Sequence, residues 1–243
     1  MTNTSEDQRL EDIAANYSAF EGFNKAIIDY GFRSIQEHFH GASCLELGTA
    51  DGVMTRQLAS AFDDLTSIDG SQRYAELIAE QLGPEFPGLT VIHTLFEDFQ
   101  PDRRFDTVIA AHILEHVDDP VAVARRALDW VAPGGKLLVL VPNAHSFNRL
   151  LGVKMGMIQT PDELVEGDHA VGHRRVYTPA TLHADLTAAG WDIACTSGVL
   201  FKPLSNAQMY ESYTHEMLEG CWLLGKDFPD NAGDILCVCT PPA

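Results

Sequence analysis

The chain has 243 residues, of which 45% are hydrophobic and 21% charged, and these proportions fit one soluble α/β domain with a modest insertion. Its formal net charge of −19 repels phosphate backbones, which argues against nucleic acid as a partner. No apolar run is long enough for a membrane span and the polar N-terminal segment is no signal peptide, so we expect a cytoplasmic protein without membrane contact. The five cysteines include no Cys-x-x-Cys pair and are interpreted as reduced core thiols.

The first 142 residues alternate between helical and extended patterns. Residues 1–12 are expected to be disordered or frayed, and residues 13–40 have the apolar spacing of one or two helices. Strands are predicted at Ser43–Leu47, Leu65–Asp69, Leu89–Thr94, Phe105–Ala111 and Lys136–Val141, and helices at Val53–Phe62, Gln72–Leu82 and Val121–Val131. This alternation predicts a parallel sheet with right-handed crossovers, whose ligands bind at the carboxyl ends of the strands.

The second half of the chain breaks this rhythm. Residues 143–178 are rich in His, Gly and Met and are predicted to form a lid or insertion. A helix at Thr181–Ala189, strands at Trp191–Leu200 and Ile235–Thr240, and a helical segment over residues 203–228 are expected to follow. We interpret residues 1–243 as a single domain with three parts: cap helices (1–40), a ligand-binding core (41–142) and a substrate-recognition region with the last strands (143–243).

The segment Glu46–Gly52 has the pattern of a ligand-binding turn. Gly48 and Gly52 follow a strand and precede a helix, and glycine allows both close backbone approach and positive φ. The spacing G-x-x-x-G differs from the G-x-G-x-x-G of dinucleotide binders, which disfavours a pyrophosphate ligand. The alternative interpretation is a tight strand-to-helix turn without a ligand.

Two further strand ends carry candidate binding groups. Asp69 ends the second strand, where its two oxygens can accept hydrogen bonds from both ribose hydroxyls of a nucleoside. Its alternative role is to cap the helix that begins near Gln72. Leu95 and Phe96 follow the third strand and can enclose a purine ring, although Phe96 is also a candidate core residue.

Together these motifs resemble those of class I, Rossmann-like S-adenosylmethionine-dependent methyltransferases of the small-molecule branch. The resemblance is carried by Glu46–Gly52, Asp69, Leu95–Asp98, His112–Pro120 and Leu128–Leu138. It implies an α/β fold: a doubly wound, seven-stranded, mostly parallel sheet with an antiparallel last strand, N-terminal helices and an insertion after strand five. It also implies S-adenosyl-L-methionine as the cofactor.

The same resemblance assigns roles to particular residues. Glu46, Gly48, Thr49 and Gly52 line the methionine end of the cofactor, Asp69 binds the ribose with Gly70 beside it, Phe96 and Glu97 lie by the adenine, and His112 lies near the methionine portion or the substrate. Two positions depart from the common pattern: Thr49-Ala50-Asp51 replaces the usual glycine-rich loop, and Leu95 stands where an acid often meets the adenine amine. The second departure leaves adenine recognition to backbone groups.

Several polar residues are candidates for the substrate side. His145 follows strand five and His173 lies in the predicted lid, and either imidazole can serve as the base that methyl transfer to an O–H or N–H group requires. A structural role for each is the alternative. Tyr17, His116, Asn143 and Arg174 are candidate substrate-binding residues.

A metal site is an open alternative for this region. His112, Glu115 and His116 with a downstream His169 or His173 resemble the E-x-x-E-H metal motif of ubiquinone-type and small-RNA-end methyltransferases. His112 replaces the first carboxylate of that motif, and metal-free relatives share the rest, so we expect activity without an added metal.

The sequence thus predicts an enzyme that transfers a methyl group from S-adenosylmethionine to an O or N atom of a small metabolite, with natural-product biosynthesis as one setting. The alternatives are a divalent-metal-assisted O-methyltransferase and a cofactor-binding scaffold without catalysis. A nicotinamide-dependent oxidoreductase is disfavoured by the missing G-x-G-x-x-G. The expected oligomeric state is a monomer or homodimer.

Overall fold

The computed structural model describes residues 4–242, which contain one seven-stranded sheet in the order β3-β2-β1-β4-β5-β7-β6. The strands are β1 (Ser43–Leu47), β2 (Asp64–Asp69), β3 (Leu89–His93), β4 (Phe105–Ala111), β5 (Val131–Pro142), β6 (Asp192–Val199) and β7 (Asp234–Thr240). Only β7 runs antiparallel to its neighbours β5 and β6. This confirms the predicted doubly wound sheet with its antiparallel last strand in sequence.

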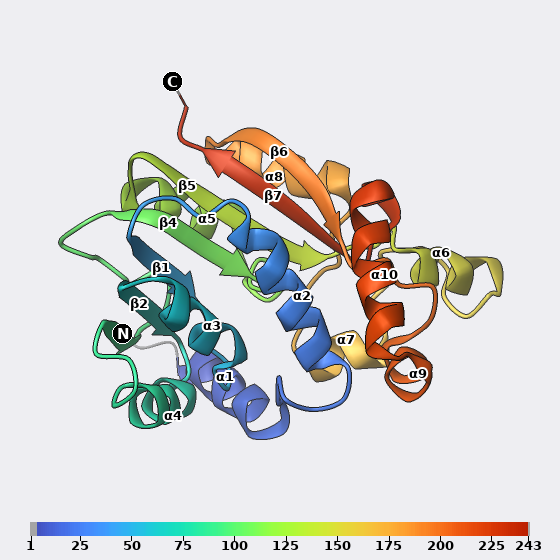
Figure 1. The fold of residues 1–243 in the computed structure, drawn as a ribbon, viewed down its shortest axis with the longest axis horizontal. Helices are drawn as coiled ribbons and strands as arrows, with labels where there is room; N and C mark the ends of the chain where they lie inside the picture. The colour runs from blue at the N-terminus through green and yellow to red at the C-terminus, as the bar shows by residue number, and fades with distance from the viewer. Residues whose placement is uncertain (1–3, 243) are drawn as a thin grey trace.

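Helices cover both faces of the sheet (Figure 1). They are α1 (Thr4–Asn16), α2 (Asn24–Gln36), α3 (Val53–Ala61), α4 (Gln72–Leu82), α5 (Pro120–Trp130), α6 (Phe147–Lys154), α7 (Glu166–Ala170), α8 (Pro179–Ala189), α9 (Asn206–Ser212) and α10 (His215–Asp227), with a 3-10 turn at Pro229–Asn231. Helices α5 and α8 pack behind the sheet in this view, and α2, α3 and α10 in front of it. None of the helices in residues 4–242 has the length and hydropathy needed to cross a bilayer.

The two hydrophobic layers follow from the alternation of side chains along each strand. On β5, Leu137, Val139 and Val141 join the core beneath α5 and α8, whereas Leu138 and Leu140 join the core beneath α2, α3 and α10. All five are at most 1% exposed. A strand buried on both faces is the continuous apolar run expected for the centre of such a sheet.

Two local predictions were wrong. Residues 4–12 are helical and not disordered, because α1 packs against the sheet end through Leu10 and carries a Glu6–Arg9 ion pair of 2.6 Å; residues 1–3 lie outside the described part of the chain. Strand β5 begins at Val131, directly after α5, since Val131 pairs with Phe105 before the register shifts. The segment 203–228 is helical as predicted and consists of two helices, because α9 ends before Thr214, which caps α10.

The strand order reverses between β1 and β4, which are direct neighbours. In an open α/β sheet the loops after the strands diverge at such a point and leave a crevice at the carboxyl ends. The predicted insertion, residues 143–178, contains α6 and α7 and lies at this same end of the sheet. The fold therefore places the glycine turn, Asp69, His112 and the insertion around one opening.

Candidate functional site

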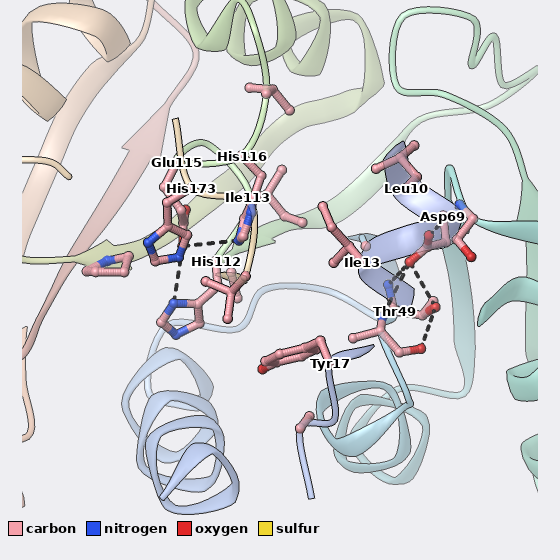
Figure 2. A pocket seen from close by; sticks show the side chains of 18 of the residues that line it. Leu10, Ile13, Tyr17, Thr49, Asp69, His112, Ile113, Glu115, His116 and His173 are labelled. Atoms are coloured by element: carbon pink, nitrogen blue, oxygen red, sulfur yellow. Dashed lines mark hydrogen bonds and ion pairs between the residues drawn. The ribbon is translucent and has the colours of Figure 1, made fainter. Parts of the chain in front are cut away.

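A cavity of about 1430 Å³ lies at the carboxyl ends of the strands. Its walls come from α1, from the loops after β1 to β5, from the insertion and from the segment after β6. Figure 2 shows two groups of side chains in it, with Tyr17 between them. We call them the Asp69 side (Gly48, Thr49, Asp69, Gly70, Leu95 and Phe96) and the histidine side (His112, Glu115, His116 and His173).

The turn after β1 on the Asp69 side requires glycine at two positions. Gly48 has φ +76° and Gly52 has φ +89°, a region that side chains disfavour. A Cβ on Gly48 would also overlap Cδ1 of Ile113, which follows β4. The turn is closed by hydrogen bonds from Gly48 N to Ile68 O (2.7 Å) and from Gly52 N to Thr49 O (2.9 Å).

Asp69 joins the ends of β1 and β2. Its Oδ2 accepts hydrogen bonds from Thr49 N (2.7 Å), Thr49 Oγ1 (3.1 Å) and Ala50 N (3.3 Å), and its Oδ1 accepts one from Ser71 N (2.8 Å). Burial raises the pKa of Asp69 despite these bonds. Ser71, and not Asp69, caps α4 by accepting from Tyr74 N, so the capping alternative for Asp69 is excluded.

An apolar wall completes the Asp69 side. Leu10, Leu95 and Phe96 all line the cavity. Gly70 lies between the first two, because a Cβ there would be 2.7 Å from Leu10 Cδ1 and 3.0 Å from Leu95 Cδ2. Glu97 lines the cavity with an exposed side chain.

Two predicted cofactor residues lie behind the wall and do not line the cavity. Gly52 precedes α3, where it lies against Ile78. Glu46 is 2% exposed; its Oε2 accepts a 2.7 Å bond from Ser67 Oγ, while Oε1 has no partner among the described residues. Burial raises the pKa of Glu46 to about 8. Both residues therefore support the structure of the turn and do not line the cavity.

The histidine side is built around a fully buried carboxylate. Glu115 is 0% exposed, and neither of its oxygens has a hydrogen-bond partner among residues 4–242. The nearest groups to Oε1 are His112 Nδ1 at 3.4 Å and His116 Nε2 at 4.0 Å. Burial alone would raise the pKa of Glu115, but the surrounding His112, His116 and His173 lower it. An ionised carboxylate without hydrogen bonds is costly to bury, so a bound group that satisfies it is expected.

His116 and His173 complete this cluster. One ligand atom from each of Glu115, His116 and His173 lies within 4.8 Å of the others, and the two imidazole rings meet edge to face with centroids 4.8 Å apart. Burial lowers the pKa of His116 to about 4, so its imidazole is neutral at neutral pH. His173 Nδ1 contacts Asp168 Oδ1 at 3.1 Å, which orients the ring.

His112 lies between this cluster and Asp234, the first residue of β7. It has φ +56°, an uncommon conformation for a residue other than glycine, and its Nε2 lies 3.8 Å from Asp234 Oδ2. Burial opposes protonation of His112, but Glu115 and Asp234 outweigh this effect and raise its pKa. Strained backbone of this kind is concentrated at functional sites.

Tyr17 lines the cavity, and hydrogen bonds to Asp51 of the glycine turn fix the chain next to it. Asp51 Oδ2 accepts hydrogen bonds from Ser18 Oγ (2.7 Å) and Ala19 N (2.8 Å), and Tyr74 Oη donates to Tyr17 O at 3.0 Å. The departure at Thr49–Asp51 from the common pattern thus ties the N-terminal segment to the turn. Burial next to Asp51 and Glu115 raises the pKa of Tyr17 to about 12.

Three predicted substrate-side residues have other tasks. His145 does not line the cavity, so we do not retain it as a candidate base. Asn143 reaches the cavity wall, but its side chain bonds to Asp230 O, Ala232 O and His145 N. Arg174 also lies off the wall; it pairs with Glu6 (3.1 Å) and Asp118 (2.7 Å) and fixes α1 to the loop after β4.

Sequence reasoning missed several polar residues on the cavity wall: Ser146, Asn148, Asp168, Lys202 and Asp234. They come from the start of α6, the insertion, the segment after β6 and the start of β7. Lys202 had one usable signal, since it is the first charged residue after a predicted strand end in an otherwise apolar stretch. Nothing in the sequence pattern shows that these segments meet.

Comparison with known sequences identifies one family. The model of a family described as a methyltransferase domain matches residues 19–196. Among curated proteins, the chain is similar to a ubiquinone biosynthesis O-methyltransferase of Xanthomonas euvesicatoria pv. vesicatoria, with 29% identity over 188 residues that cover 72% of each chain.

Comparison with solved structures gives the same fold. The N-methyltransferase NodS from Bradyrhizobium japonicum WM9, in complex with S-adenosyl-L-homocysteine, has a TM-score of 0.63 at 17% identity and 98% coverage of both chains. The CcbJ methyltransferase from Streptomyces caelestis has a TM-score of 0.62 at 16% identity, covering 95% of this chain and 96% of that one. At these identities the match concerns the fold.

Proposed function

Because the chain belongs to the methyltransferase domain family, we propose that it transfers a methyl group from S-adenosylmethionine to an oxygen or nitrogen atom of a small molecule. The observation that carries this proposal is one continuous cavity with the Asp69 side at one end, the histidine side at the other and Tyr17 between them. A donor and an acceptor bound in one cavity meet the need of methyl transfer for proximity and alignment.

The Asp69 side fits the cofactor. Asp69 Oδ1 accepts one hydrogen bond from the described residues, and a carboxylate oxygen has room for a second, which a ribose hydroxyl supplies. Leu95 and Phe96 offer apolar surface for the adenine, and Gly48 lies against Ile113, which follows His112 of the histidine side. When bound, S-adenosylmethionine supplies an electrophilic methyl group on its sulfonium.

Calorimetry with S-adenosylhomocysteine tests the cofactor assignment. We expect Asp69→Ala to weaken binding by about 1.5–3 kcal/mol, the range for hydrogen bonds to a charged group. Asp129→Ala removes an exposed acid from α5, away from the cavity, and serves as the control for net charge. Unchanged affinity in a folded Asp69→Ala variant would limit Asp69 to bracing the turn.

The histidine side supplies the acid–base chemistry. The acceptor's O–H or N–H group must lose a proton as the methyl group arrives, and His173, oriented by Asp168, is the candidate base. Loss of this base should lower kcat by roughly 10²-fold and leave cofactor affinity unchanged. Turnover of His173→Ala, compared with that of the exposed His215→Ala, measures this effect.

A second candidate function is divalent-metal-assisted O-methylation. Its specific support is the cluster of Glu115, His116 and His173. The Glu115 oxygens have no hydrogen-bond partner among the described residues. Asp168 contacts Nδ1 of His173, which leaves Nε2 of that ring as the atom that can bind an ion. Two imidazoles and one carboxylate form a donor set that suits a transition metal better than magnesium. In that case Glu115, His116 and His173 hold the ion, which lowers the pKa of an acceptor hydroxyl.

Chelation separates the two candidates. If the metal-free base mechanism is correct, dialysis against a chelator leaves turnover unchanged and elemental analysis of the purified protein finds no stoichiometric metal. Loss of turnover that one added metal restores, together with metal content that disappears in Glu115→Gln, would establish the metal-assisted route. The His215→Ala protein controls for surface-bound ions.

A further inference from the structure

Lys202 is a cation without a partner on the cavity wall. It follows β6, its side chain is partly buried, and no carboxylate of residues 4–242 lies within the 4.0 Å of an ion pair. Its stem crosses the backbone of Gly233, where a Cβ would be only 2.5 Å from Lys202 Cδ. The absence of a side chain on Gly233 therefore leaves room for the lysine stem to lie along the cavity wall.

The start of α6 brings one more unpartnered polar group to the same place. Ser146 precedes the helix and lines the cavity at 3% exposure, yet its hydroxyl neither caps α6 nor bonds to any other described residue. Asn148 N donates to Lys202 O at 3.1 Å, which joins α6 to the segment after β6. We call Ser146 and Lys202 the α6 cluster.

The charges around the α6 cluster select the kind of ligand. The neighbouring Arg149 is occupied by Asp168 (3.2 Å), Pro161 O (2.6 Å) and Glu163 O, so of these two cations Lys202 is the one without an ion pair to any residue of 4–242. The helix start adds positive potential and Ser146 adds a donor. Asp168, Asp234 and Glu115 also line the cavity and would repel a dianion. A single negative charge shared by two oxygens fits best.

We propose that the α6 cluster binds the carboxylate of the methyl acceptor, which is therefore a small carboxylic acid that also carries the hydroxyl or amino group to be methylated. This inference rests on the proposed function for the role of the histidine side. His112 lies between the two: it contacts Glu115 on one edge and Asp234, which lies next to Gly233, on the other. The carboxylate would thus fix the acceptor with its reactive group towards His112 and His173.

Matched acid and amide probes test the proposal. With S-adenosylhomocysteine present, ligand-observed NMR compares 3-hydroxybenzoate and 3-aminobenzoate with the corresponding benzamides. We expect the wild-type protein to bind the acids about tenfold more tightly, since a charge-assisted hydrogen bond is lost in the amides. Lys202→Met should reduce this preference to about twofold or less, and Ser146→Ala should reduce it in part. Lys154→Met removes an exposed lysine from the other end of α6 and should keep it.

The outcomes are distinct. Equal binding of acids and amides by the wild-type protein, or an acid preference that survives in a folded Lys202→Met variant, overturns the proposal. Calorimetry with S-adenosylhomocysteine on the same samples checks the proposed function separately. Cofactor binding without acid preference refutes the α6 cluster alone, whereas acid preference without cofactor binding refutes the methyltransferase function and leaves the anion site standing. Transfer from labelled S-adenosylmethionine to the acids, lost in Lys202→Met, would support both.

Discussion

At the scale of single residues, Gly48 occupies a position in the turn after β1 where a side chain has no room. Its φ of +76° and the overlap of a Cβ with Ile113 both act against substitution. Gly134 has nearly the same φ, +80°, with no atom within 4 Å of a Cβ, so it isolates the conformational part. We expect Gly134→Ala to lower the free energy of unfolding by about 1 kcal/mol and Gly48→Ala to lower it by more.

Denaturant unfolding of both variants measures the difference. Gly48→Ala should cost less stability in an Ile113→Ala background than in the wild type, because that background lacks the overlapping atom. Equal losses in Gly48→Ala and Gly134→Ala, with the same cost of Gly48→Ala in both backgrounds, would show that the turn moves freely away from Ile113.

The buried Glu46 predicts a pH dependence of stability. Its folded pKa of about 8 lies above the ordinary value of 4.5, so between these values the folded state keeps a proton that the unfolded state releases. Stability from this group therefore falls as pH rises through that window, by about 1.4 kcal/mol for each unit of pKa difference at most. Glu46→Gln should flatten the profile between pH 5 and pH 8 as recorded by urea unfolding; an unchanged slope would contradict the assignment.

The candidate site could be predicted from the sequence only where residues follow a strand within a familiar motif. Thr49, Asp69, Gly70, Phe96 and His112 do line the cavity as their positions at strand ends suggested. Glu115 was recognised only as part of a motif, because its lack of hydrogen-bond partners is a property of packing. Ser146 and Lys202 are 56 residues apart in the chain and meet only through tertiary structure.

At the scale of elements, Arg149 attaches the segment after β5 to α6 through several hydrogen bonds. The guanidinium of this α6 residue bonds to Pro161 O, Glu163 O and Asp168, with a side chain 14% exposed. We expect Arg149→Met to raise amide exchange in residues 159–170 at least severalfold. Arg125→Met, which removes a bond from α5 to Ala188 O, is the control. Exchange in this stretch that Arg149→Met leaves unchanged would mean that other contacts hold it.

The central strands were predictable because each is an apolar run bounded by turn residues. The misjudged elements depend on contacts between distant segments. Helix α1 reads as a polar, acidic tail, and it is held by Arg9 and Arg174 around Glu6 and by Leu10 against Gly70. The early start of β5 at Val131, ahead of Pro133-Gly134-Gly135, is likewise imposed by pairing with β4. Local propensity cannot show either effect, because tertiary contacts override it.

At the scale of the whole molecule, the cavity joins segments from almost the full length of the chain. Its wall extends from Glu6 in α1 to Asp234 in β7 and includes both halves of the sheet. A ligand bound there can contact the cap helices, the core and the region after β5. Because a ligand that binds only the folded state stabilises whatever unfolds with its site, thermal unfolding can show whether these parts form one cooperative unit.

We therefore expect a single unfolding transition that shifts as a whole with cofactor. S-adenosylhomocysteine at a hundred times its Kd adds about 2.7 kcal/mol, which corresponds to a rise in Tm of roughly 5–10 °C for a domain of this size. Asp69→Ala should show a much smaller rise at the same concentration, whereas Asp129→Ala should match the wild type. Two transitions in calorimetry, of which only one moves, would show that the cap helices or the region after β5 unfold independently of the core, against the single-domain prediction. A single transition that ignores the ligand would instead remove the cavity as the cofactor site.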